Sequence, residues 1–149
     1  VLDDGWFGSR RNDTKGLGDW VVSQEVWPDG LGPLIDHVRS RGMDFGIWVE
    51  PEMANPDSDL LREHPEWMLA VEGRDPLLAR HQQVIDLANE ECFAHILGRL
   101  DALLSDNAIA FVKWDDNRGL TDAAHEGRAA AHGQTIALYR LFDPRLRAR

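Results

Sequence analysis

The stretch "FVKWDDNRG", residues 111–119, changes character halfway along its length. It begins with apolar and aromatic residues around Lys113 and continues into carboxylates, an amide, a guanidinium and a glycine. Side chains alternate across a strand, so Lys113 and Asp115 should share one face while Trp114 points to the other. The stretch therefore predicts a buried strand that leaves the core at its C-terminal end and presents charged side chains there.

Two further strands are expected to end in the same way, "VLDDGW" at residues 1–6 and "GIWVEPE" at residues 46–52. Their alternation with helical patterns predicts an α/β fold with parallel strands and crossover helices. The carboxyl ends of such strands form the ligand-binding face. Four helices are expected, over residues 31–42, a short piece of 55–65, 89–107 and 121–142, and Gly42 should end the first of them. The stretches 67–71 and 83–87 resemble strands and flank a polar loop, 72–81.

The composition narrows the function classes. The chain has 149 residues, 43% of them hydrophobic, which is enough for one domain-sized core. A net charge of −10 argues against nucleic acid or an anionic membrane as a partner, and no apolar run is long enough to span a bilayer. One cysteine, Cys92, and histidines without metal-ligand spacing offer no internal disulfide and no zinc site, and favour a cytoplasmic location; no metal and no cofactor is expected.

Two pairs of charged residues at the strand ends are candidates for a site. Lys113 would keep the Asp115 carboxylate ionised, as a nucleophile requires, although an ordinary ion pair would give the same pattern. Asp3 and Asp4 are paired acceptors that suit the vicinal hydroxyls of a sugar. The "DDG" string that ends in Gly5 would equally form an Asx-type turn.

The second strand end and one arginine add weaker candidates. Trp48 beside Glu50 and Glu52 is typical of a binding pocket in which a tryptophan ring stacks on the face of a sugar. A tryptophan packed in the core and followed by solvated glutamates would give the same pattern. Arg80 is either a fixed donor that reaches into a pocket or a surface arginine. The recurrence of such residues at three strand ends favours one shared site.

The motifs "LDDGWFG", "GDW", "WVEPEM", "PDSDL", "HPEW" and "VKWD" resemble those of the α-galactosidases of glycoside hydrolase family thirty-six. The resemblance covers essentially the whole chain. It implies a catalytic (β/α)₈ barrel that follows a β-sandwich domain and precedes a small C-terminal β domain. Residues 1–149 would then be the N-terminal to middle part of that TIM barrel, about half of it, with the flanking domains absent.

The resemblance also implies roles for individual residues. Asp115 would be the nucleophile of a retaining, double-displacement hydrolysis of terminal α-linked galactose from oligosaccharides such as melibiose and raffinose. The expected acid/base is a carboxyl group on a later strand that the chain ends before reaching, so the fragment alone should be inactive. The residues expected to bind the galactose are Asp3, Asp4, Trp48, Arg80 and Lys113.

Two other functions remain open at this stage. A family transglycosylase, such as a raffinose synthase, would use the same strand ends with a different acceptor. A non-catalytic sugar-binding remnant would bind an α-galactoside without turnover, because the acid/base is missing. The expected partner is an α-galactoside oligosaccharide in either case, with no nucleic acid and no membrane, and the full-length enzyme is expected to be a homo-oligomer.

Overall fold

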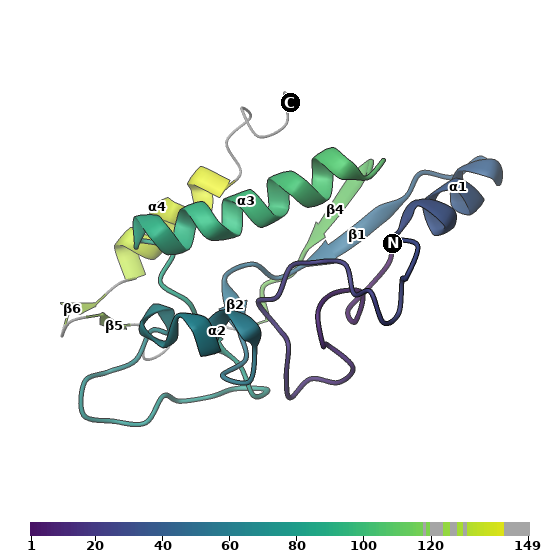
Figure 1. Cartoon of the computed structure of the whole chain (residues 1–149). Coiled ribbons are helices and arrows are strands. Elements are labelled where there is room, and N and C mark those ends of the chain that lie inside the picture. Colours follow the sequence, from purple (N-terminus) through teal and green to yellow (C-terminus); the bar gives the residue numbers. More distant parts are fainter. Residues whose placement is uncertain (118, 120–123, 126–127, 130, 142–149) are drawn as a thin grey trace.

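The computed structural model describes residues 1–117, 119, 124–125, 128–129 and 131–141. Strand β1 (Gly46–Val49) pairs in parallel with β4 (Phe111–Trp114). Leu2 forms a parallel bridge with Ile47 on the other edge of β1. Three chain segments therefore run side by side in the same direction and end at the same side, as the sequence predicts (Figure 1).

Strand β1 lies between the other two segments and is buried along its whole length. A Cβ atom added to Gly46 would lie 2.5 Å from the Phe111 ring and 3.1 Å from Phe111 O, so the close approach of β1 and β4 favours glycine there. Phe111 itself is 53% exposed, and the prediction of a buried strand at this position is wrong. Within the described residues β4 pairs with β1 alone, which leaves its second edge uncovered.

Helix α1 (Gly32–Ser40) precedes β1 and is followed by Gly42 at φ +75°, as predicted. Helix α3 (Glu90–Asp106) runs alongside the β1–β4 pair in Figure 1. Its first turn is capped by Asn89, which accepts hydrogen bonds from two backbone amides. Leu100 and Leu103 are buried, whereas the neighbouring Leu104 is 38% exposed.

The segment between β1 and α3 folds back on itself. Strand β2 (Met53–Ala54) pairs antiparallel with β3 (Gln83–Val84). Helix α2 (Asp59–Glu63), capped by the Ser58 hydroxyl, and the 3₁₀ turn η1 (Pro65–Trp67) lie between these strands.

The strand-like stretches at 67–71 and 83–87 therefore do not join the parallel sheet. The first contributes a single antiparallel bridge, from Met68 to Ile85, and the second forms β3 and supplies Ile85 to that bridge. The connection from β2 to β3, which contains the short helix α2 and the turn η1, returns the chain beside β2 in the antiparallel direction.

The last helix is shorter than predicted. Helix α4 covers Ala131–Leu141, and the preceding segment forms an antiparallel pair, β5 (Ala124–His125) with β6 (Arg128–Ala129). The sequence "AHEGRA" at 124–129 carries a glycine and no large apolar side chain that could anchor a helix on the core. The rest of the predicted helix, residues 121–123, 126–127, 130 and 142, lies outside the described residues.

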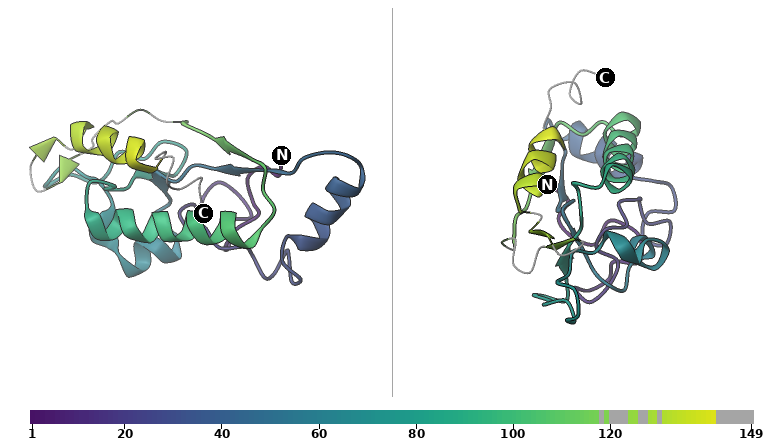
Figure 2. Two further views of the ribbon diagram at one scale, coloured as in Figure 1. Left: turned by 90° about the horizontal axis from the view of Figure 1, so that it is seen from above. Right: turned by 90° about the vertical axis from the view of Figure 1, so that its left-hand side faces the viewer.

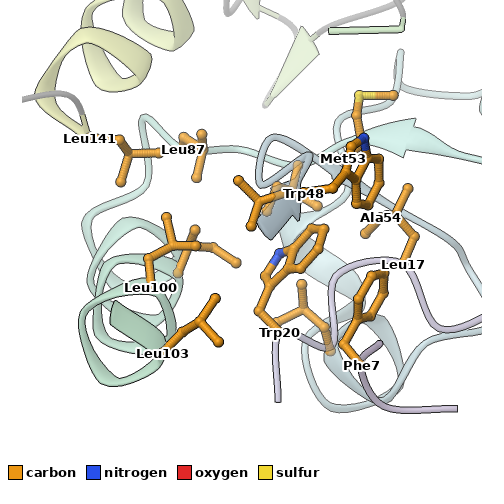
Figure 3. Close-up of a cluster of buried hydrophobic side chains, with 14 of the residues drawn as sticks. Phe7, Leu17, Trp20, Trp48, Met53, Ala54, Leu87, Leu100, Leu103 and Leu141 are labelled. Atoms are coloured by element: carbon orange, nitrogen blue, oxygen red, sulfur yellow. The ribbon is translucent and has the colours of Figure 1, made fainter. Parts of the chain in front are cut away.

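The core joins the helices to the N-terminal loop through β1. Figure 3 shows leucines of the helical side facing Trp48 and Trp20, with Phe7 and Leu17 of the N-terminal loop beyond them. Phe7 stacks on Trp48 with ring centroids 6.2 Å apart and planes inclined by 10°. Helices α3 and α4 lie beside one another (Figure 2), joined by an ion pair between Glu90 and Arg140.

Candidate active site

Asp115 lies where β4 ends, at the side of the sheet that the sequence predicts for a ligand. Its backbone amide donates to Val49 O at 2.9 Å and so extends the pairing of β1 with β4 by one residue. Its side chain accepts a hydrogen bond from Trp48 Nε1, which lies 3.0 Å from Asp115 Oδ2. The neighbouring strand therefore fixes both the backbone and the carboxylate of Asp115.

The hydrogen bond from the Trp48 indole is the main cause that lowers the pKa of Asp115 below its ordinary value. The Asn117 side chain and the Asp116 amide lower this pKa further, and the charge of Lys113 contributes least. The expectation that Lys113 keeps Asp115 ionised is therefore correct in sign but names a minor cause. At neutral pH the Asp115 side chain is an ionised, half-buried carboxylate at a strand end.

Lys113 is paired with Asp3 rather than with Asp115. Lys113 Nζ lies 2.8 Å from Asp3 Oδ2, across the ends of two segments that are more than a hundred residues apart in sequence. Their hydrogen bond lowers the pKa of Asp3 and raises the pKa of Lys113, so both groups are charged at neutral pH. Both side chains remain exposed and so can contact a ligand.

Asp4 is held by a buried arginine. Arg10 donates to both carboxylate oxygens of Asp4, with Nε 2.9 Å from Oδ1 and Nη2 2.8 Å from Oδ2. The Arg10 side chain is 3% exposed, whereas that of Asp4 is 38% exposed. The predicted turn is also present, since the Asp4 amide donates to Asp3 Oδ1 and Gly5 has φ +96°. The turn and the fixed carboxylates are thus parts of one arrangement.

Glu50 and Glu52 are buried, so the expectation of a solvated loop for these residues is wrong. Glu50 Oε1 accepts from the Asn117 amide at 3.1 Å and from Gln82 Nε2 at 3.2 Å. Glu52 Oε2 accepts from Trp114 Nε1 at 3.0 Å. Burial raises the pKa of both carboxyl groups, that of Glu52 to about 8, so the Glu52 side chain is mostly protonated at neutral pH.

Trp48 and Arg80 occupy different surroundings. Trp48 is 3% exposed, and its ring packs in the aromatic cluster while its N–H reaches Asp115. Arg80 lies exposed at the tip of a hairpin that precedes β3. The hairpin is joined to the strand ends through Gln82, which donates to Glu50, and through the His81 carbonyl, which accepts from Asn55 Nδ2 at 2.8 Å.

The structure thus brings five of the six predicted site residues into two contact groups. Lys113 with Asp3 forms one, and Trp48 with Asp115 forms another; Asp4 follows Asp3 directly. Arg80 lies apart from both groups, and its hairpin is linked to Asp4 through the His81 carbonyl and the Asn55 and Arg10 side chains. Sequence reasoning missed three residues of this network, because no local pattern marks a buried polar partner: Arg10, Asn55 and Gln82.

Among the described residues, no three His, Cys, Asp or Glu side chains are grouped to hold a metal ion. In the same part of the chain, no helix combines the length and apolar character needed to cross a bilayer. The cytoplasmic location and the homo-oligomeric state stay predictions.

A carboxylate-rich ligand face at the ends of parallel strands is the arrangement of an α/β enzyme. The Melibiase family model matches residues 1–148, and the chain belongs to this family. The α-galactosidase of Escherichia coli is 51% identical to the chain over 143 residues, which cover 96% of this chain and 20% of that protein. The chain therefore spans about a fifth of the length of the relatives it matches.

Solved structures agree with this assignment. The GH36 α-galactosidase AgaB from Geobacillus stearothermophilus superposes with a TM-score of 0.91 at 40% identity, over 97% of this chain and 21% of that one. A variant of AgaA from the same organism, in complex with raffinose, gives a TM-score of 0.89 at 40% identity, over 96% and 21% of the two chains. The strand ends described above are thus similar in arrangement to those of enzymes that bind α-galactosides.

Proposed function

We propose that this chain is part of a retaining α-galactosidase and that Asp115 is its nucleophile. The observation that carries the proposal is the ionised Asp115 carboxylate at the end of β4, fixed by the Trp48 N–H at 3.0 Å. A nucleophilic carboxylate must be deprotonated and aimed, and this hydrogen bond supplies both conditions. The naming of the relatives as α-galactosidases, one of them in complex with raffinose, supports the choice of substrate.

The remaining predicted residues bind the galactose in this proposal. Asp3 and Asp4 accept hydrogen bonds from sugar hydroxyls, and Lys113 donates one while it stays paired with Asp3. Arg80 supplies a further donor from the hairpin tip. Trp48 contributes mainly through Asp115, because its ring is buried against Phe7.

The reaction proceeds in two displacements. An Asp115 oxygen attacks the anomeric carbon, the glycosidic C–O bond breaks, and the departing oxygen takes a proton from a second carboxyl group. Water then attacks the same carbon, gives a proton to that second carboxylate, and releases Asp115. The two carboxyl groups of a retaining enzyme stand about 5–5.5 Å apart. The second one is expected beyond residue 149, which makes hydrolysis a property of the complete protein.

The same proposal extends to the fold. The parallel segments at Leu2, β1 and β4, with α1 and α3 between them, repeat the β/α unit of a barrel. A (β/α)₈ barrel takes roughly 250 residues, so the chain corresponds to about half of one. Its domain assignment, the N-terminal to middle part of a catalytic barrel, is part of this proposal.

Hydrolysis of an aryl α-galactoside by the complete gene product tests the proposal. Proton NMR of the first product should show α-galactose, because two inversions restore the starting configuration. Asp115→Asn should lower kcat on the order of a thousandfold or more. Asp116→Asn is the matched control: it changes an adjacent exposed carboxylate and should alter kcat by less than about threefold.

First-formed β-galactose, or an Asp115→Asn variant with the activity of the control, would refute the assignment of Asp115. Transfer of galactose to sucrose in preference to water would identify a transglycosylase instead. Binding of an α-galactoside without any turnover would identify a sugar-binding protein.

A further inference from the structure

The hairpin that carries Arg80 has an unusual backbone. Ala79 and Gln82 close it through two hydrogen bonds of 3.2 and 3.1 Å, which leave Arg80 and His81 as its two central residues. Both have positive φ, +54° and +62°. Two-residue hairpins with this geometry strongly prefer asparagine, aspartate or glycine, because most other residues are strained at positive φ. Histidine adopts positive φ more readily than most residues, but arginine does not, so contacts beyond the turn itself help to hold it.

One such contact comes from Asn55, directly after β2. Its Nδ2 atom donates to His81 O at 2.8 Å and to Asp13 O at 3.2 Å. Its Oδ1 atom accepts from the Leu17 amide at 2.8 Å and from Arg10 Nη1 at 3.0 Å. The Asn55 side chain is completely buried, and both of its donor and both of its acceptor positions are in use.

The other end of this hydrogen-bond network lies beside the carboxyl ends of the parallel strands. Arg10, which donates to Asn55, also holds both oxygens of the Asp4 carboxylate. Asn55 therefore lies between Asp4, a proposed acceptor for sugar hydroxyls, and the turn that presents Arg80, a proposed donor. A buried, fully satisfied polar network fixes one geometry, because each alternative arrangement leaves a buried group unpaired.

We infer that Asn55 is a positioning residue that fixes the hairpin carrying Arg80 relative to Asp4, so that both side chains contact one galactose. The inference rests on the proposed function. The position requires an amide, because the His81 carbonyl needs a donor while Arg10 and the Leu17 amide need an acceptor. Aspartate keeps the acceptor and loses the donor, so Asn55→Asp separates the two halves of the network.

A double-mutant cycle in the complete gene product tests the inference. Arg80→Ala and Asn55→Asp should each raise KM for an aryl α-galactoside roughly tenfold, with a smaller change in kcat. In the Arg80→Ala background, Asn55→Asp should add less than about twofold, because the side chain that it positions is gone. A purely structural role for Asn55 predicts independent, multiplicative effects and would overturn the inference.

A rescue variant addresses the turn itself. Glycine adopts positive φ without strain, so His81→Gly should hold the turn without its hydrogen bond to Asn55. Added to Asn55→Asp, it should return KM to within about threefold of the starting value. Absence of rescue would count against the inference. Should Asn55→Asp not fold, Asn55→Ser, which places no charge in the buried site, replaces it in the same cycle.

Hydrogen exchange separates this inference from the proposed function. In Asn55→Asp, amides of a peptide spanning residues 77–83 should exchange faster, while those of a peptide within α3 should not change. If the starting protein hydrolyses no galactoside, the proposed function fails and the exchange result still tests the hairpin contact. Unchanged exchange together with independent kinetic effects would overturn the role of Asn55 alone.

Discussion

Replacing Trp48 by phenylalanine isolates the hydrogen bond that controls Asp115. The substitution keeps an aromatic ring against Phe7 and removes the N–H that lies 3.0 Å from Asp115 Oδ2. That hydrogen bond is the largest cause of the lowered pKa of Asp115, so its loss should raise this pKa. The other charged groups around Asp115, which are Glu50, Lys113 and Asp116, stay unchanged.

The expected size follows from the hydrogen bond. A hydrogen bond to a charged acceptor contributes about 1.5–3 kcal/mol, and each pKa unit corresponds to about 1.4 kcal/mol. Because Asp115 is only half-buried, solvent screening favours the lower end of this energy range. The bond stabilises the ionised form, so its effect is present at neutral pH and is lost as the pH falls through the pKa. The acid limb of kcat/KM should therefore move to higher pH by about one unit.

The assay is kcat/KM for an aryl α-galactoside between about pH 3.5 and 7. Trp6→Phe is the matched control, because the buried Trp6 indole also donates one hydrogen bond, at 2.8 Å, but to the Trp48 backbone carbonyl rather than to the Asp115 carboxylate. Both variants lose an indole ring and one hydrogen bond, and only Trp48→Phe should shift the acid limb. An unshifted limb in Trp48→Phe, or an equal shift in both variants, would refute the role given to this hydrogen bond.

Three further predictions concern stability and substrate choice. The folded protein holds the Glu52 proton up to a pKa of about 8 and the unfolded chain releases it near 4.5, so stability should fall between these pH values. Glu52→Gln, which keeps an acceptor for Trp114, should be more stable at pH 8 by about 2–4 kcal/mol, and equal urea midpoints at pH 8 would contradict this. Asp4→Asn should lower kcat/KM for galactosides about tenfold and keep the fold, since one side-chain oxygen still accepts a hydrogen bond from Arg10. Circular dichroism that shows an unfolded variant would instead mean that Asp4 serves the turn rather than substrate binding. Residues 1–149 produced alone should self-associate and hydrolyse no melibiose, because the edge beside Phe111 is open; a cooperatively unfolding, active monomer would contradict this.

The parts of the fold that depend on a local pattern could be predicted from the sequence. Helix α3 follows from apolar residues at helical spacing after the cap residue Asn89, and the position of Asp115 follows from the change of character along β4. The direction of β3 could not be predicted, because "QVIDL" indicates a strand without indicating its neighbour. The exposure of Phe111 depends on an open edge, which its own sequence does not show.

The contacts within the candidate site were largely beyond sequence reasoning. The alternation along the strand predicts Lys113 beside Asp115, two residues away, but Lys113 pairs with Asp3 across the sheet. Arg10 and Asn55 lie 45 residues apart in segments without periodicity, so nothing local shows that they meet. Burial of charged and amide groups depends on such distant partners, and only the folded chain reveals them.

The most direct test of the central claim, that Asp115 attacks the anomeric carbon, is azide rescue of Asp115→Ala in the complete gene product. Without its nucleophile the variant should be almost inactive on an aryl α-galactoside. Azide in the vacated position should attack the anomeric carbon as the aryl C–O bond breaks, which restores turnover and releases the phenolate. Because Asp115 attacks from the face opposite the leaving group, NMR should identify the product as β-galactosyl azide. An α-azide, or an Asp115→Ala variant that retains near-normal kcat without azide, would contradict the assignment of Asp115.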